Sequence, residues 1–172
     1  MSGGLKSGLV LLTFGLICGL LLAVVNEFTA DKIAAEELRL KTQAIEEYYS
    51  LDEYYIEIEE FEEGNIDSIF YIKESEDSDE VYALAYSVSA NGYGGAITAL
   101  VVIENDLTVQ DYKIISHSES GPGTVVTDYD FNYSQADSIS SFDGIAGATY
   151  TSNAMREIFS AIADRVESDM GV

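Results

Sequence analysis

The stretch EVYALAYSVSANGYGGAITALVVIENDLTVQDYKIIS, residues 80–116, contains three runs rich in β-branched and aromatic residues, separated by turn residues. Such runs are typical of β-strands. The run ALVVI, residues 99–103, is apolar throughout, as in a strand that is covered on both faces. The glycine-rich sequence NGYGG and the pair Asn105 and Asp106 separate the runs. The pattern predicts antiparallel strands joined by short turns.

Strand-like and helical patterns flank this stretch. The runs YYIEI and IDSIFYI, residues 54–58 and 66–72, are separated by Gly64 and Asn65. Near the C-terminus, apolar residues recur at helical spacing and predict an amphipathic helix packed on the sheet: Met155, Ile158, Phe159, Ile162 and Val166. We therefore expect an α+β fold with an antiparallel sheet and a C-terminal helix.

The N-terminal segment GLVLLTFGLICGLLLAVV, residues 8–25, is long and apolar enough to cross a membrane. A cleaved signal peptide is the alternative, but the apolar stretch is long and no small-x-small cleavage site follows it. Lipid attachment at Cys18 is disfavoured because the bulky Ile17 precedes it. Lys6 favours a cytoplasmic location for the short N-terminal side. We expect a single-pass anchor in the cytoplasmic membrane, with the rest of the chain outside.

Residues 26–49 show the pattern of a helix that continues from the anchor. On its expected packing face lie Ala34, Leu38, Ile45 and Tyr49. The sequence thus predicts three segments: a transmembrane anchor over 1–27, a stalk helix over 28–50 and an extracytoplasmic domain over 51–172.

Composition excludes several classes of protein. The net charge is −23, from 31 acidic and 8 basic residues, and it would repel the phosphates of a nucleic acid, so we expect no nucleic-acid partner. Cys18 is the only cysteine, which excludes a disulfide framework, cysteine-ligated zinc, iron–sulfur clusters and covalent haem. The acidic runs lack the spacing of a calcium loop, and we expect no metal site. Redox chemistry would need a cofactor held in another way.

The segment DGIAGATYTS, residues 143–152, lies where the C-terminal helix is expected to begin. Gly147 and Ala148 permit close backbone approach to a ligand. The free N–H groups of a first helical turn form a natural seat for an anion such as phosphate. Several side chains could cap the helix, and an ordinary cap is the alternative role of Thr149: Thr149, Thr151, Ser152 and Asn153.

This segment resembles the flavinylation motif, written D..(S/T)GAT, of the G subunit of Rnf electron-transport complexes and of the related C subunit of sodium-pumping NADH:quinone oxidoreductase. Asp143, Gly147 and Ala148 match the motif, whereas Ala146 stands where the family has Ser or Thr. Thr149 matches the threonine that carries FMN through a phosphoester. The resemblance implies that a separate flavin transferase attaches FMN to Thr149, with Asp143 serving its recognition, and that the chain has no catalytic residue of its own.

Two other segments resemble the same family, in the same order along the chain. NGYGGAITALVVIEND, residues 91–106, is similar to the glycine turn GYGGPI and its following strand, with Ala96 in place of proline. SHSESGPG, residues 116–123, is similar to an H.ETPG segment that lies beside the flavin. The resemblance thus implies further flavin contacts, from Tyr93, Gly94, His117, Glu119, Ser120, Gly121, Ala146, Gly147, Ala148, Tyr150 and Thr151.

Simpler roles for these residues stay open from the sequence alone. His117 and Glu119 could be surface-loop residues, and Tyr93 could cover the sheet. Hydrolysis is disfavoured because no nucleophile completes a triad with His117 and a carboxylate.

The resemblance implies a flavin-carrying electron-transfer subunit of an ion-translocating ferredoxin:NAD⁺ oxidoreductase of the Rnf type. Its partners would be the other membrane and peripheral subunits of that complex. The C subunit of the quinone reductase, a stand-alone extracytoplasmic flavoprotein and a cofactor-free adhesion or scaffold module are the alternatives.

Overall fold

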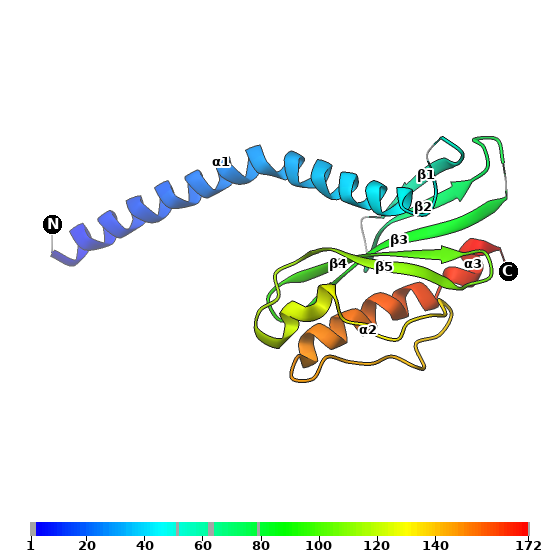
Figure 1. Ribbon diagram of the computed structural model, residues 1–172. Coiled ribbons are helices and arrows are strands. Elements are labelled where there is room, and N and C mark those ends of the chain that lie inside the picture. The colour runs from blue at the N-terminus through cyan, green and yellow to red at the C-terminus, as the bar shows by residue number, and fades with distance from the viewer. Residues whose placement is uncertain (1–2, 51, 62–63, 79, 172) are drawn as a thin grey trace. The chain divides into compact units, whose positions relative to one another are not determined.

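The computed structural model describes residues 3–50, 52–61, 64–78 and 80–171. The chain divides into two compact units, Met1–Arg39 and Leu40–Val172. The elements, shown in Figure 1, are α1 (Gly3–Glu46), β1 (Tyr55–Glu60), β2 (Ile66–Lys73), β3 (Val81–Asn91), β4 (Ala96–Glu104), β5 (Val109–His117), the 3₁₀-helix η1 (Gly121–Thr127), α2 (Thr149–Ala163) and α3 (Val166–Met170).

The five strands form one antiparallel sheet in chain order, β1-β2-β3-β4-β5. Each strand therefore pairs with its neighbours in sequence, which short turns make possible. At the turn between β3 and β4, Asn91 pairs with Ala96, and Gly92 N donates to Gly95 O over 2.8 Å. The predicted α+β fold with an antiparallel sheet is confirmed.

Both faces of the central strands are covered. In β4 every residue from Ile97 to Ile103 is buried, as its continuous apolar run predicts. Helix α2 packs on one face and buries Met155, Ile158, Phe159 and Ile162. This face of the sheet and α2 form the larger hydrophobic core.

The C-terminal helical pattern ends earlier than the spacing of its apolar residues suggests. Helix α2 ends at Ala163, and Val166, which is buried, begins the short α3. Asp169, in α3, accepts a hydrogen bond from the Tyr86 hydroxyl over 2.7 Å. It also forms an ion pair with Arg165, with 2.6 Å between the nitrogen and oxygen atoms. Burial raises the pKa of Tyr86, so its phenol stays protonated and can donate this bond.

The other face of the sheet packs against residues 40–49. Ala44, Ile45 and Tyr49 are buried there against sheet residues: Phe70, Ile72, Ala83, Ala85, Leu100 and Val102. The predicted packing face is thus correct for Ile45 and Tyr49. Ala34 and Leu38, which belong to the first unit, are exposed instead.

The predicted anchor and stalk form one continuous helix, α1. Within the described residues, the segment Lys6–Glu46 is the one helix long and apolar enough to cross a membrane, and its most apolar window is fully exposed. A helix of this kind is typical of a single-pass membrane anchor. The change of composition near Asn26 therefore marks an end of the apolar surface and not an end of the helix.

Ile45→Ala is expected to lower the free energy of unfolding by about 2–5 kcal/mol, because the Ile45 side chain is fully buried and its loss leaves a cavity. Ile58→Ala is the matched control, since Ile58 on edge strand β1 is 45% exposed, and we expect a change of about 0.5 kcal/mol. Urea unfolding of the full-length chain in detergent measures both. Equal effects would contradict the packing of residues 40–49 on the sheet.

Candidate flavin site

A cavity of about 520 Å³ lies at the N-terminal end of α2. Its walls come from the β3–β4 turn, the segment that enters η1, and the loop and first turn of α2 (Figure 1). The lining residues are Tyr93, Ser120, Gly121, Pro122, Gly123, Gly147, Ala148, Thr149, Tyr150 and Thr151. None of these lining residues has a charged side chain, in a chain of net charge −23.

Thr149 presents an unused hydroxyl to this cavity. It is the first residue of α2, and Ala148 occupies the N-cap position without a side-chain hydrogen bond. The alternative role of Thr149 as a helix cap is therefore not what the structure shows. Thr149 is exposed, and within the described part of the chain its hydroxyl makes no hydrogen bond.

The first turn of α2 also presents N–H groups. Ser152 N is the first to donate to the helix start, to Ala148 O over 2.9 Å. The N–H groups of residues 149–151 precede it, so they belong to the set that a helix leaves without an intrahelical partner. Together with the helix dipole they favour an anion at this end of the cavity.

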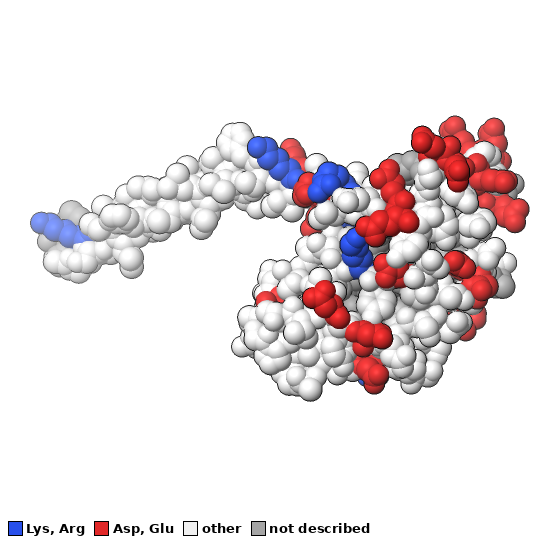
Figure 2. Space-filling view, in the orientation of Figure 1, with Lys and Arg blue, Asp and Glu red and all other residues white. Residues whose placement is uncertain are grey.

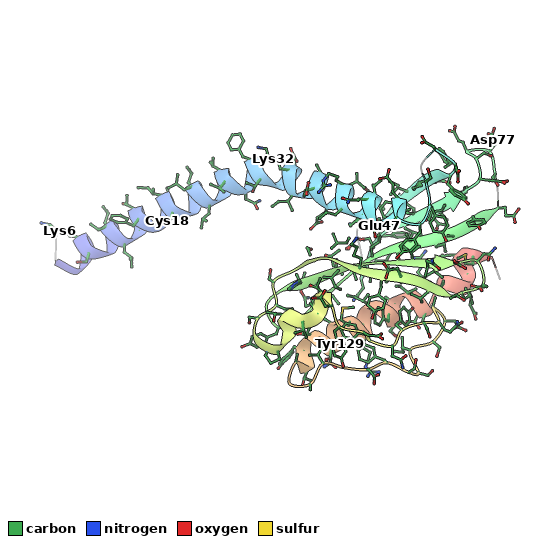
Figure 3. All side chains as sticks on the ribbon, in the orientation of Figure 1. Lys6, Cys18, Lys32, Glu47, Asp77 and Tyr129 are labelled. Carbon is green, nitrogen blue, oxygen red and sulfur yellow. The ribbon has the colours of Figure 1, made fainter. Side chains whose placement is uncertain are left out.

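The loop that leads into Thr149 is fixed from two sides. Ser152 Oγ accepts from Ile145 N and donates to Ala148 O, each over 2.9 Å. The Tyr129 hydroxyl, on the α2 side of the sheet in Figure 3, donates to Gly144 O over 2.9 Å. Gly147 has a φ of +79°, a conformation that favours glycine. These contacts hold the Thr149 backbone in place without using its side chain.

Behind the cavity lies a buried carboxylate, that of Glu119. Its Oε1 accepts from Gly94 N over 2.9 Å, and its Oε2 accepts from the Thr151 hydroxyl. The Glu119 N–H donates to His117 Nδ1 over 3.1 Å, and His117 Nε2 lies 3.3 Å from Thr127 Oγ1. Glu119 is only 7% exposed, so it is not a surface-loop residue.

The structure brings most of the sequence-predicted site residues together. Eight line the cavity: Tyr93, Ser120, Gly121, Gly147, Ala148, Thr149, Tyr150 and Thr151. Three do not line it but form the hydrogen-bonded layer behind it: Gly94, His117 and Glu119. Ala146 is exposed in the preceding loop and does not line the cavity either.

Two lining residues, Pro122 and Gly123, were missed at the level of sequence. Both belong to the SHSESGPG segment, so its extent was the signal that could have found them. Gly123 is needed for close packing, because a Cβ there would lie 2.7 Å from Glu119 Oε2. Tyr129 and Ser152, which fix the loop, gave no signal of that role.

Two exposed aromatic rings flank the cavity. Tyr93 and Tyr150 are 70% and 66% exposed, and their ring centroids are 6.1 Å apart at an interplanar angle of 43°. Rings that are this exposed on a folded domain are available to a planar aromatic ligand or a protein partner.

The acidic side chains of the domain gather elsewhere. Figure 2 shows many of them around the turn between β2 and β3, which carries Asp77 in Figure 3. In the same view the surface over the N-terminal end of α2 is mostly uncharged. The cavity is thus a place on this acidic chain whose lining carries no charge, and two donors satisfy the carboxylate of Glu119 behind it.

Comparison with known protein families agrees with this site. A family model described as the FMN-binding domain matches residues 92–164, which include all three segments that line or support the cavity. A second, described as the RnfG N-terminal region, matches residues 4–47. No curated protein matches the chain.

The residues of the cavity fit an FMN group. Its volume lies in the range of ligand sites, about 300–1,000 Å³, and it combines aromatic rings, small residues and a few hydroxyls. The small residues leave room beside Thr149, and a Cβ on Gly147 would reach to 3.7 Å from Pro122 Cγ across the lining. Bound FMN would supply one- and two-electron redox chemistry at this site.

Proposed function

Because this chain is an RnfG-type FMN-binding subunit, a flavin-binding electron-transfer protein with an N-terminal membrane helix, we propose that it relays electrons within an Rnf-type ferredoxin:NAD⁺ oxidoreductase through FMN esterified to Thr149. The observation that carries this proposal is the exposed Thr149 hydroxyl at the edge of an uncharged cavity. The coupled ion would be Na⁺ or H⁺.

Thr149 is a better acceptor than its neighbour Thr151. Thr151 is 1% exposed, and its hydroxyl donates to Glu119. A separate transferase can reach only a hydroxyl at the surface, which favours Thr149. Asp143, exposed at the start of the motif, is available for recognition by that enzyme.

The attachment step forms one bond and breaks one. Thr149 Oγ forms an ester bond to the phosphorus of the flavin nucleotide, and its proton passes through solvent to the leaving group. The bond from that phosphorus to the leaving group of the donor breaks, and its electron pair goes to the leaving group. A flavin dinucleotide is a donor of this class, and no oxidant is needed.

The residues of this chain then hold the group without carrying out chemistry themselves. The N–H groups at the start of α2 would stabilise the phosphate oxygens, and no lining residue carries a charge that would repel them. Tyr93 and Tyr150 would offer their exposed rings to the flavin, and Ser120 and Gly121 line the same cavity. Because both tyrosines are exposed, a flavin ring held beside them would lie near the surface, where electron exchange with a partner requires only proximity.

The rest of the chain supports this role as a membrane subunit. We assign residues 1–27 to the anchor, 28–50 to the stalk and 51–172 to the flavin domain. Lys6 favours a cytoplasmic N-terminus and an extracytoplasmic domain in the cytoplasmic membrane. The match of residues 4–47 to the RnfG N-terminal region supports an assembly with the other subunits of an Rnf-type complex.

Purification from native membranes in mild detergent tests this assignment. The tagged full-length chain is expected to carry FMN and to copurify with several multi-span subunits that catalyse ferredoxin-dependent reduction of NAD⁺. A preparation that instead reduces quinone with NADH would identify the chain as the quinone-reductase C subunit. A flavin-loaded chain that purifies alone would support the stand-alone flavoprotein and overturn membership of the complex.

A further inference from the structure

Glu119 joins three segments that lie far apart in the sequence. Its two carboxylate oxygens bond separately, one to the β3–β4 turn at Gly94 and the other to the first turn of α2 at Thr151. These partners lie 25 and 32 residues away. Each partner directly follows one of the two exposed tyrosines, Tyr93 and Tyr150.

We propose that Glu119 is a positioning residue, which holds the two aromatic walls of the cavity at a fixed separation by fastening the backbone behind Tyr93 to the helical turn behind Tyr150. The proposal depends on the proposed function only in taking FMN as the ligand of the cavity. The clamp itself is a property of this chain's own residues.

The surroundings of the carboxylate allow it little freedom. A Cβ on Gly92 would overlap Glu119 Oε1, and a Cβ on Gly123 would lie 2.7 Å from Oε2. The carboxylate therefore occupies a slot that exists only because both positions are glycine. The hydrogen bond from Glu119 N to His117 Nδ1 fixes its backbone as well. A side chain enclosed in this way transmits its position to both partners.

Burial makes both hydrogen bonds necessary. Glu119 is only 7% exposed as a residue and has lost most of its hydration, and a buried carboxylate is tolerated when donors replace the water. Bonds to a charged acceptor are stronger than those between neutral groups. Removal of the carboxylate therefore releases the Gly94 amide and the Thr151 hydroxyl together, and the two walls lose their common support.

Hydrogen exchange at the Gly94 amide tests the clamp without any flavin. In the unloaded full-length chain in detergent micelles, Glu119→Ala is expected to speed exchange of this amide on the order of tenfold, the factor that corresponds to one hydrogen bond of ordinary strength. Glu119→Gln is expected to retain protection, because its amide oxygen can accept from Gly94 while its NH₂ donates to Thr151 Oγ1. Glu157→Ala, an exposed glutamate on α2, is the matched control and should change nothing.

The loaded protein gives a second, independent reading. Time-resolved fluorescence anisotropy is expected to show a more mobile flavin in Glu119→Ala than in the wild type or in Glu119→Gln. The mass of the FMN adduct in the wild type tests the proposed function separately. If the wild-type chain carries no adduct, the proposed function fails, and hydrogen exchange at the Gly94 amide still tests the clamp.

Unchanged Gly94 exchange in Glu119→Ala would overturn the clamp. Equal acceleration in Glu119→Gln would also overturn it, because charge and not hydrogen-bond geometry would then be responsible. If Glu119→Ala does not fold, Thr151→Val carries the test, since it removes only the donor on α2. In Thr151→Val the Gly94 amide still has its acceptor and should stay protected, so a more mobile flavin in this variant would support the clamp and an unchanged flavin would contradict it.

Discussion

Thr149→Ala is expected to abolish covalent flavin loading completely. The hydroxyl of Thr149 is the atom that would form the ester, and the other threonine of the motif, Thr151, is buried and bonded to Glu119. Because the Thr149 side chain neither caps α2 nor hydrogen-bonds to another described residue, its replacement should leave the fold intact. Coexpression with a flavin transferase, followed by in-gel flavin fluorescence and intact mass, measures the loss directly.

Two further variants make this result specific. Thr149→Ser keeps a hydroxyl at the same position and should retain loading, although a more mobile side chain lowers the yield. Thr108→Ala is the matched control, because Thr108 lies in the turn region before β5 and does not line the cavity. Its adduct should equal that of the wild type, with an added mass of FMN less one water.

A fluorescent band in Thr149→Ala would show that another residue carries the flavin. A dark band in the wild type, with an active transferase present, would contradict covalent attachment altogether. The cavity would then hold FMN without a bond, as the match to the FMN-binding domain allows.

The sheet and α2 could be predicted because their signals are local. The strands are indicated by runs of β-branched residues, and the helix by the spacing of Met155, Ile158 and Phe159. These patterns predict which side of each element is buried, wherever the other elements lie. The continuous apolar run in β4 likewise predicts a strand that is buried on both faces. For the same reason the three motif segments could be found, since each is a short, contiguous stretch.

The resemblance placed Gly94, His117 and Glu119 at the flavin site, but their hydrogen bonds behind the cavity could not be predicted. Glu119 is one of 31 acidic residues, and its burial depends on partners 25 and 32 residues away. The SHSESGPG segment marks Glu119 as a site residue, but nothing in that segment shows that its side chain is buried. The N-cap was missed for a related reason: four good capping residues follow Ala148, but the backbone of the loop decides where the helix begins.

Gly94→Ala is expected to destabilise the domain by about 3 kcal/mol or more, because overlap with backbone atoms cannot be relieved by a rotamer change. A Cβ at this position would overlap the Ser118 carbonyl oxygen and lie 3.2 Å from Glu119 Cα. The turn that carries Tyr93 and the segment that carries Glu119 would have to separate, so the flavin cavity should open as well. Urea unfolding of the full-length chain and the yield of FMN adduct measure the two effects.

Gly121→Ala separates this steric effect from a simple preference for glycine. Gly121 has a φ of +60°, but a Cβ there would meet no atom within 4 Å, so the expected cost is only the backbone penalty of about 1–2 kcal/mol. The two substitutions add the same methyl group and differ only in what it would touch. Glycine is required at position 94 because of the contact with Ser118, and it is favoured at position 121 because of the positive φ. Equal losses of stability would therefore mean that the glycine turn does not pack on Ser118. A larger loss for Gly94→Ala, together with a lower yield of adduct, would show that close packing of these two segments forms the flavin site.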